Sequence, residues 1–163
     1  MNIYLIRHGD AEKVSIGKKD FDRELTPTGR IKFKTAVQNW KNLIKGFDFI
    51  VTSPLARAVQ TANIIAGLYG REDKILIDKK LSCGSRTESI IEIANSLEGV
   101  DIAFVGHQPD FSEILSDLIS AKGAYIDFKK GAIAKISFGN KVSAAKGTLE
   151  FLIPASIFNS PTL

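Results

Sequence analysis

Four short apolar runs, separated by longer stretches with helical spacing, constrain the fold of this 163-residue chain most strongly. The runs lie at residues 2–6, 47–52, 75–77 and 102–105, and none is long enough to be a helix of ordinary length. Strands that alternate with helices are typical of parallel sheets, because a crossover segment must carry the chain back before the next parallel strand begins. The pattern predicts an α/β fold: a three-layer sandwich with a mostly parallel central sheet and helices on both faces.

The stretches between the runs carry the start and stop signals of helices. Thr26-Pro27 begins the first predicted helix, because threonine caps an N-terminus and proline is tolerated in the first turn, and Gly46 ends it. Ser53-Pro54 repeats this signal before a second helix, which stops near Gly70. Two more helices are expected, before and after the fourth strand. The predicted buried stripes of the first and last helices consist of Phe33, Ala36, Val37, Trp40, Leu43 and Ile44, and of Phe111, Ile114, Leu115, Leu118 and Ile119.

The end of the chain has a different character. Residues 132–138 and 148–153 are two strand-like runs with no helical segment between them. In the second run apolar residues alternate, which would place Leu149, Phe151 and Ile153 on one face. The runs predict an antiparallel strand pair at or near one side of the sheet. Since no repeat, linker or low-complexity tract interrupts the chain, residues 1–163 are expected to form a single domain.

Composition excludes several functional classes. Lys and Arg exceed Asp and Glu by 22 − 18 = 4, an excess that suits an anionic ligand but is too small and scattered to indicate nucleic acid. No apolar stretch approaches the ~20 residues of a membrane span, and the N-terminus does not resemble a signal peptide. The single cysteine excludes an intrachain disulfide and fits a reducing compartment. We therefore expect a cytoplasmic protein without nucleic-acid or membrane partners, with a monomer as its simplest state.

Three of the predicted strands are followed by side chains suited to phosphate. The first is followed by Arg7 and His8, the second by Ser53 and Arg57, and the fourth by His107. The carboxyl ends of parallel strands meet at one edge of a sheet, where open α/β sheets place their ligand crevice. The planar fork of arginine matches phosphate oxygens, and helix N-termini add free N–H groups. This edge is therefore predicted to form a pocket for a tetrahedral dianion.

The histidines add a chemistry that a pocket of donors lacks. A neutral imidazole has an acceptor nitrogen that can act as a nucleophile and form a covalent intermediate. If His8 points one ring nitrogen at phosphorus, the other should donate to a nearby backbone carbonyl, which would fix the tautomer. Arg7, Arg57 and His107 could then stabilise the charge on the equatorial oxygens of the phosphoryl group.

A zinc site is a rival interpretation, because two histidines together with Asp10 or Asp110 could supply ligands. The guanidinium of Arg7, next to His8 in the chain, would repel a dication at that position. We therefore expect no metal at this edge of the sheet.

Four segments occur in an order that is characteristic of one family. They are Leu5-Ile6-Arg7-His8-Gly9-Asp10-Ala11, residues 23–29 (Arg-Glu-Leu-Thr-Pro-Thr-Gly), residues 52–62 (Thr-Ser-Pro-Leu-Ala-Arg-Ala-Val-Gln-Thr-Ala) and Val105-Gly106-His107-Gln108-Pro109. The chain thereby resembles the histidine phosphatase superfamily, with its phosphoglycerate mutase-like fold, and most closely the short SixA-type phosphohistidine phosphatases. The resemblance implies that His8 is the transiently phosphorylated nucleophile. It also implies that Arg7, Arg57 and His107 complete the phosphate pocket, that Arg23 adds a further contact, and that no metal or organic cofactor is needed.

Two departures from larger members of the family bear on the substrate. Mutases and many larger phosphatases have a glutamate acid after the third strand, but residues 79–85 contain no carboxylate. A general acid is typically worth about a hundred- to ten-thousand-fold in rate, so its absence favours the labile P–N bond of phosphohistidine over alkyl phosphates. Asp10, Glu88 and Asp110 remain candidate acids, each weighed against a capping or solvated role. The chain also has no large insertion to form a lid, which suits a phosphorylated side chain on a protein.

Three functions therefore stay open. The first is a phosphohistidine phosphatase that acts on a phosphorylated protein through a phospho-His8 intermediate. The second is a small-molecule phosphomonoesterase of the same superfamily. The third is a non-catalytic phosphate-binding module, which the intact set of Arg7, His8, Arg57 and His107 disfavours.

Overall fold

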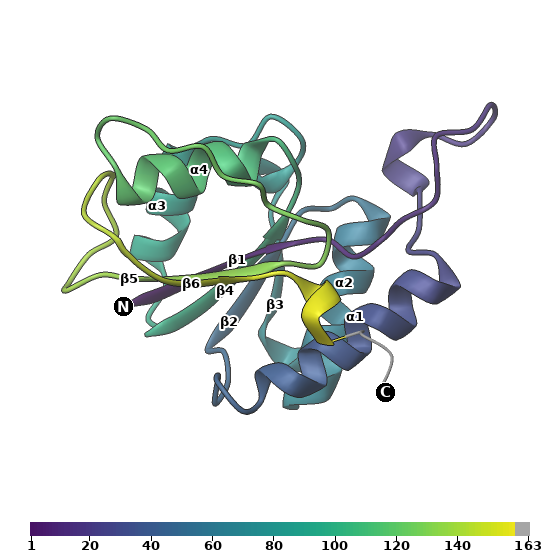
Figure 1. The fold of residues 1–163 in the computed structure, drawn as a ribbon, viewed down its shortest axis with the longest axis horizontal. Coiled ribbons are helices and arrows are strands. Elements are labelled where there is room, and N and C mark those ends of the chain that lie inside the picture. Colours follow the sequence, from purple (N-terminus) through teal and green to yellow (C-terminus); the bar gives the residue numbers. More distant parts are fainter. Residues whose placement is uncertain (159–163) are drawn as a thin grey trace.

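A six-stranded sheet forms the centre of the computed structural model, which describes residues 1–158 (Figure 1). The strands are β1 (Asn2–Arg7), β2 (Phe49–Thr52), β3 (Ile75–Ile77), β4 (Asp101–Gly106), β5 (Ile133–Ser137) and β6 (Thr148–Ile153), in the spatial order β3-β2-β4-β1-β5-β6. The first four strands pair in parallel, whereas β5 is antiparallel to both β1 and β6. The predicted mostly parallel sheet, with an antiparallel pair from the C-terminal segment at one side, is confirmed.

Two pairs of helices cover the two faces of this sheet. The helices are α1 (Pro27–Trp40), α2 (Ala56–Tyr69), α3 (Thr87–Ser96) and α4 (Asp110–Ile119), and short 3₁₀ turns are η1 (Asp20–Asp22), η2 (Glu72–Lys74), η3 (Lys79–Leu81) and η4 (Ala155–Phe158). Figure 1 shows α3 and α4 on one side of the sheet and α1 and α2 on the other. The α/β three-layer sandwich is therefore confirmed.

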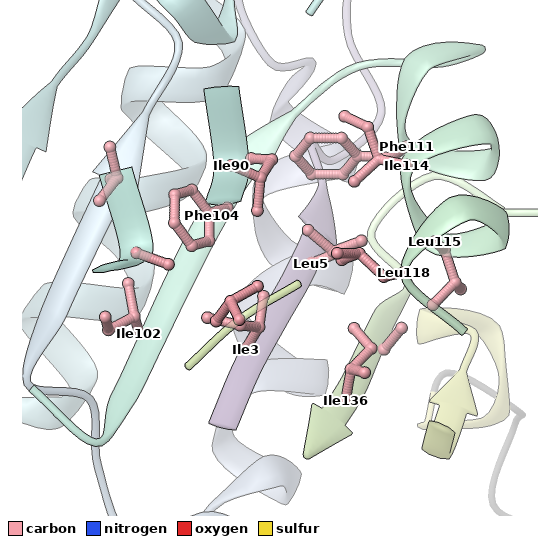
Figure 2. Close-up of a cluster of buried hydrophobic side chains, with 14 of the residues drawn as sticks. Ile3, Leu5, Ile90, Ile102, Phe104, Phe111, Ile114, Leu115, Leu118 and Ile136 are labelled. Atoms are coloured by element: carbon pink, nitrogen blue, oxygen red, sulfur yellow. The ribbon is translucent and has the colours of Figure 1, made fainter. Parts of the chain in front are cut away.

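The central strands are apolar throughout because both of their faces are buried. In β1, Ile3 and Leu5 pack into the cluster under α3 and α4, part of which Figure 2 shows. Tyr4 and Ile6 point to the opposite face and pack into the cluster under α1 and α2. This two-sided burial explains why the strand reads as a continuous apolar run rather than as an alternating one.

The prediction of the first helix is wrong at its C-terminal end. α1 stops at Trp40, whose carbonyl then accepts bonds from the backbone N–H groups of Leu43 and Ile44, both at 2.8 Å. These turns keep Ile44 in the core but leave Leu43 58% exposed, although the helical spacing predicted Leu43 to be buried.

The prediction that Leu149, Phe151 and Ile153 lie on one face of the last strand is also wrong. Leu149 pairs with Ile136, and Phe151 pairs with Lys135, so the register shifts by one residue between them. A bulge of this kind turns the following side chains to the other face of a strand. Phe151 and Ile153 pack against the cluster under α1 and α2, whereas Leu149 is 37% exposed. Among residues 1–158, none of the helices has the length and hydropathy needed to cross a membrane.

Candidate active site

The ends of three adjacent strands, β2, β4 and β1, bring the predicted site residues together. Arg7 lies opposite Gly106 in the β1–β4 register. The ladder continues past the strand ends, because the N–H of His8 donates to the carbonyl of Gly106 at 3.1 Å. On the other side of β4, the N–H of Ser53 donates to the carbonyl of Val105 at 3.0 Å. The backbone itself therefore places His8 and Ser53 on either side of the chain that leads to His107.

The two imidazoles form the buried centre of the site. The ring centroids of His8 and His107 lie 5.3 Å apart, and both side chains are buried. Gly106 leaves room for the ring of Phe111 beside His107, because a Cβ at this position would lie 2.5 Å from that ring.

One ring nitrogen of His8 is free of a proton. Nδ1 of His8 lies 2.7 Å from the carbonyl oxygen of Gly9, and since a carbonyl only accepts, Nδ1 carries the proton. Nε2 therefore has a lone pair, which accepts a bond from Nε of Arg57 at 3.3 Å. Burial, followed by the effects of His107, Arg57 and Arg7, lowers the pKa of His8 to about 3, against the raising effect of the Gly9 carbonyl. His8 is thus neutral near pH 7, in the form that can act as a nucleophile.

His107 is fixed by a serine rather than by the backbone. Nε2 of His107 lies 2.8 Å from Oγ of Ser53. The same hydroxyl oxygen accepts a bond from the N–H of Leu55 at 3.3 Å. Burial, followed by the cation of Arg57, lowers the pKa of His107 to about 4, against the raising effect of the Asp20 carboxylate. Nδ1 of His107 is buried and has no hydrogen-bond partner within residues 1–158. A bound anion could satisfy this nitrogen if it carries the proton.

Ser53 therefore has a different role from the one that the sequence predicts. Its position before Pro54 indicated a helix cap, but the N-cap of α2 is Leu55 and no side chain caps this helix. The hydroxyl of Ser53 instead holds the ring of His107. Sequence reasoning placed Ser53 at this edge of the sheet, but spacing alone does not show that its hydroxyl contacts His107.

Two arginines lie beside the imidazoles. Arg57 is in the first turn of α2, as predicted, and is only 3% exposed. Nη1 of Arg7 donates to the carbonyl of Phe128 at 2.8 Å, while its Nε is buried with no partner in the described part of the chain. Arg7 and Arg57 both lower the pKa of each histidine after the larger effect of burial, which places all four side chains within electrostatic reach of one another.

Arg23 joins the site through an aspartate that the sequence did not single out. Nε of Arg23 lies 2.8 Å from Oδ1 of Asp20, and Nη1 of Arg23 donates to the carbonyl of Glu12 at 2.6 Å. The other carboxylate oxygen of Asp20 accepts a bond from Nη2 of Arg57 at 3.0 Å. Asp20 thus bridges the two arginines. Its position in a polar loop, far from any strand end, carries no signal that would have found it.

The structure places the three candidate acids in other contacts or in solvent. Oδ1 of Asp10 pairs with Nζ of Lys130 at 2.6 Å. Oδ2 of Asp110 accepts bonds from the N–H groups of Gly84 at 2.8 Å and Ser85 at 3.1 Å. Glu88 is exposed in the first turn of α3. Over residues 1–158, no group of three or more His, Cys, Asp and Glu side chains is arranged to hold a metal ion.

A cavity of about 320 Å³ lies beside this cluster but is not part of it. Gly9, Asp10, Lys32, Phe33 and Lys130 are among its lining residues, whereas neither histidine lines it. This cavity therefore contains neither of the two histidines that the sequence predicts to react.

The sequence of this chain is similar to that of one known protein family. The family model of the histidine phosphatase superfamily (branch 1) matches residues 3–82. A phosphohistidine phosphatase SixA homolog of Haemophilus influenzae is 30% identical over an alignment of 152 positions, and the alignment covers 86% of this chain and 91% of that protein.

Solved structures show the same fold. The protein histidine phosphatase SixA complexed with tungstate has a TM-score of 0.82 at 19% identity, covering 96% of this chain and 99% of that one. A phosphoserine phosphatase of Entamoeba histolytica, in complex with 3-phosphoglyceric acid, has a TM-score of 0.67 at 19% identity, covering 93% and 95%. The sequence matches, together with this shared fold, show that the chain belongs to the histidine phosphatase superfamily and is a phosphatase of the SixA type.

Proposed function

We propose that this phosphatase hydrolyses phosphohistidine on a protein through a covalent phospho-His8 intermediate. The observation that carries the proposal is the state of His8: its Nδ1 proton is held by the Gly9 carbonyl, and its Nε2 lone pair faces Arg57. In this role Arg7, Arg57 and His107 hold the phosphoryl oxygens, and Arg23 adds a contact from the loop.

The reaction proceeds in two displacements at phosphorus. Nε2 of His8 attacks phosphorus as the P–N bond of the substrate breaks. A phosphoimidazole protonated on its other nitrogen leaves as neutral imidazole, so this step needs no acid from the protein. Water then attacks phospho-His8, the second P–N bond breaks, and the water oxygen and protons pass to inorganic phosphate and solvent. The arginines stabilise the charge on the phosphoryl oxygens in both steps.

The contacts of the carboxylates support a substrate with a good leaving group. Residues 79–85 contain no carboxylate, and Asp10 and Asp110 are engaged by Lys130 and by backbone N–H groups. A site without a free acid favours a phosphoramidate over an alkyl phosphate, whose leaving oxygen must be protonated.

The surface beside the site supports a protein as the carrier of that substrate. The loop that contains Asp20 exposes Val14 by 77% and Phe21 by 50%, and Ile16 is fully exposed as well. Apolar side chains that remain in solvent next to a phosphate pocket would gain contact area from a docked protein, but not from a free metabolite.

Matched peptides test this proposal directly. The same peptide sequence is prepared with phosphohistidine and with phosphoserine, and kcat/KM is measured for both. We expect the phosphohistidine peptide to be hydrolysed faster. Faster hydrolysis of the phosphoserine peptide would support the small-molecule or alkyl phosphatase alternative instead.

Trapping the intermediate tests the mechanism. The enzyme is mixed with a labelled phosphoramidate, quenched at alkaline pH and mapped by peptide. We expect label on His8, no label and no turnover in His8→Ala, and normal labelling in Glu88→Gln, which changes an exposed carboxylate of α3. Turnover of the His8→Ala variant at the rate of the unmodified protein would contradict a covalent route.

A further inference from the structure

We infer that Asp20 is an internal anion that occupies the arginines of the phosphate pocket and that a phosphoryl dianion displaces it. The inference rests on the phosphate pocket of the proposed function, but not on the identity of the substrate. Residues 12–23 form a loop that is here called the arm. The consequence of the inference is that the arm is released when phosphate binds. The arm projects from the body of the molecule at the upper right of Figure 1.

Arg57 shows the competition most clearly. Its Nε donates to Nε2 of His8, its Nη1 to the main-chain carbonyl of Asp20 at 2.8 Å, and its Nη2 to Oδ2 of Asp20 at 3.0 Å. All three nitrogens of this buried guanidinium are therefore engaged, two of them by Asp20. A phosphoryl group on His8 needs the same donors, because paired N–H groups are what arginine offers to a phosphate.

Arg23 holds the other side of the same carboxylate. Its Nε and Nη2 lie 2.8 Å and 2.6 Å from Oδ1 of Asp20. One carboxylate thus contacts two cations of the pocket, as a bound oxyanion would. The side chain of Asp20 is also 51% exposed, so it can leave the arginines for water without crossing packed side chains.

Charge decides which anions can take this place. A carboxylate carries one negative charge and two oxygens, whereas a phosphoryl group carries up to two charges and offers three oxygens to the same donors. A monoanion such as acetate offers the arginines the same charge as the Asp20 carboxylate, so little binding free energy is gained when it replaces Asp20. Asp20 therefore makes the pocket selective for dianions.

The position of Asp20 links this exchange to the arm. In residues 1–158, the hydrogen bonds between η1 and α2 both run from Arg57 to Asp20. The base of the arm is held separately, by the N–H of Glu12 to the carbonyl of Glu24 at 2.9 Å and by a bridge between Ala11 and Leu25. Displacement of Asp20 would free the tip of the arm while its base stays in place.

Binding of inorganic phosphate and of tungstate, measured by calorimetry, tests the competition. We expect Asp20→Asn to bind both anions about two- to fivefold more tightly, as expected when one ion pair no longer opposes binding. Asp22→Asn is the matched control, because Asp22 lies in the same 3₁₀ turn, its carboxylate has no ion pair with a pocket arginine, and the variant loses the same charge. It should bind like the unmodified protein. Weaker or equal binding by Asp20→Asn would overturn the inference.

Limited trypsin digestion tests the coupling, since the arm contains Lys13, Lys18 and Lys19. We expect phosphate to accelerate cleavage of the arm in the unmodified protein, and we expect Asp20→Asn to be cleaved rapidly with or without phosphate. Protection of the arm by phosphate in the unmodified protein would overturn the inference.

These measurements separate the inference from the proposed substrate. If the anion affinities change as expected while phosphohistidine is not hydrolysed, the proposed function fails and the inference stands. If neither the unmodified protein nor Asp20→Asn binds phosphate or tungstate, the inference fails, and the peptide assay reports on the proposed function independently.

Discussion

Each histidine of the site is held by one short hydrogen bond, and the two partners differ in kind. Nδ1 of His8 is held at 2.7 Å by the main-chain carbonyl of Gly9, which no substitution can remove. Nε2 of His107 is held at 2.8 Å by the hydroxyl of Ser53, which a single substitution removes. The role of His107 can therefore be tested through Ser53 without changing the imidazole.

We predict that Ser53→Ala lowers kcat by about two- to tenfold, which corresponds to the loss of one hydrogen bond of about 0.5–1.5 kcal/mol. KM should change less, because the arginines proposed to bind the phosphoryl group remain. The measurement is steady-state hydrolysis of the phosphohistidine peptide, with Ser120→Ala as the control, since Ser120 bonds only locally at the end of α4. A variant with unchanged kcat would show that Ser53 does not position His107.

Residues that follow strands could be found from the sequence, whereas partners from loops could not. Arg7, His8 and His107 follow directly from the end of an apolar run, and the topology of parallel sheets brings such ends together. Asp20 contacts Arg57 from 37 residues away in the chain. Neither spacing nor composition predicts a contact that depends on the path of a polar loop.

At the level of elements, helices cover each face of the sheet. The helical spacing of apolar residues predicts which of their side chains are buried, except at the helix ends. Leu115 of α4 is fully buried in the cluster shown in Figure 2. Leu43 belongs to the same kind of predicted stripe, yet it lies beyond the end of α1 and is exposed. Periodicity continues past a helix end in the sequence, but the direction of the side chains changes when the backbone leaves the helix.

We predict that Leu115→Ala lowers the free energy of unfolding by about 2–5 kcal/mol, because it leaves a cavity among packed side chains. Leu43→Ala removes the same atoms from an exposed position and should change this free energy by less than about 0.5 kcal/mol. Urea denaturation of both variants gives the comparison. Similar losses in the two variants would mean that Leu43 is buried, as the helical spacing alone predicted.

Substitution by alanine should change the free energy of unfolding in opposite directions at two helical glycines. At Gly29 in α1, a Cβ would lie 2.2 Å from the carbonyl oxygen of Asp10, so the backbone beside His8 must move. At Gly67 in α2, the nearest atom would be a carboxylate oxygen of Glu72 at 3.8 Å, which is an ordinary contact. We predict that Gly29→Ala destabilises by about 1–3 kcal/mol. Gly67→Ala should stabilise by about 0.5–1 kcal/mol, and urea midpoints that shift in the same direction would contradict this contrast.

The C-terminal strands show why strand register could not be predicted from the sequence. The alternation of residues 148–153 predicts a strand, and this is confirmed. The bulge between the residues paired with Lys135 and Ile136 depends on how β6 meets β5, a contact that alternation within one strand does not describe. Fold class follows from the order and pattern of elements, whereas strand register depends on their packing.

For the whole molecule, the burial of both histidines makes the stability depend on pH in one direction. The chain has only two histidines, and burial lowers their pKa values in the folded state to about 3 and about 4. In the unfolded chain an imidazole has its ordinary pKa of about 6.5. Between these values the unfolded state binds more protons than the folded state, so acid favours unfolding. The stability is therefore fully present above about pH 7 and is lost as the pH falls toward 4.

We predict that the free energy of unfolding falls by about 4 kcal/mol between pH 7 and pH 5, with about half of the loss due to each histidine. Urea denaturation in buffers without phosphate measures it, because phosphate would bind the folded pocket and stabilise it. His8→Asn and His107→Asn should each remove about half of the dependence, since asparagine does not titrate. Stability that stays constant between pH 7 and pH 5 would mean that folding does not lower the two pKa values. Stability that rises would mean that the imidazoles are protonated in the folded protein. In that case His8 would lack the free lone pair on which covalent catalysis depends.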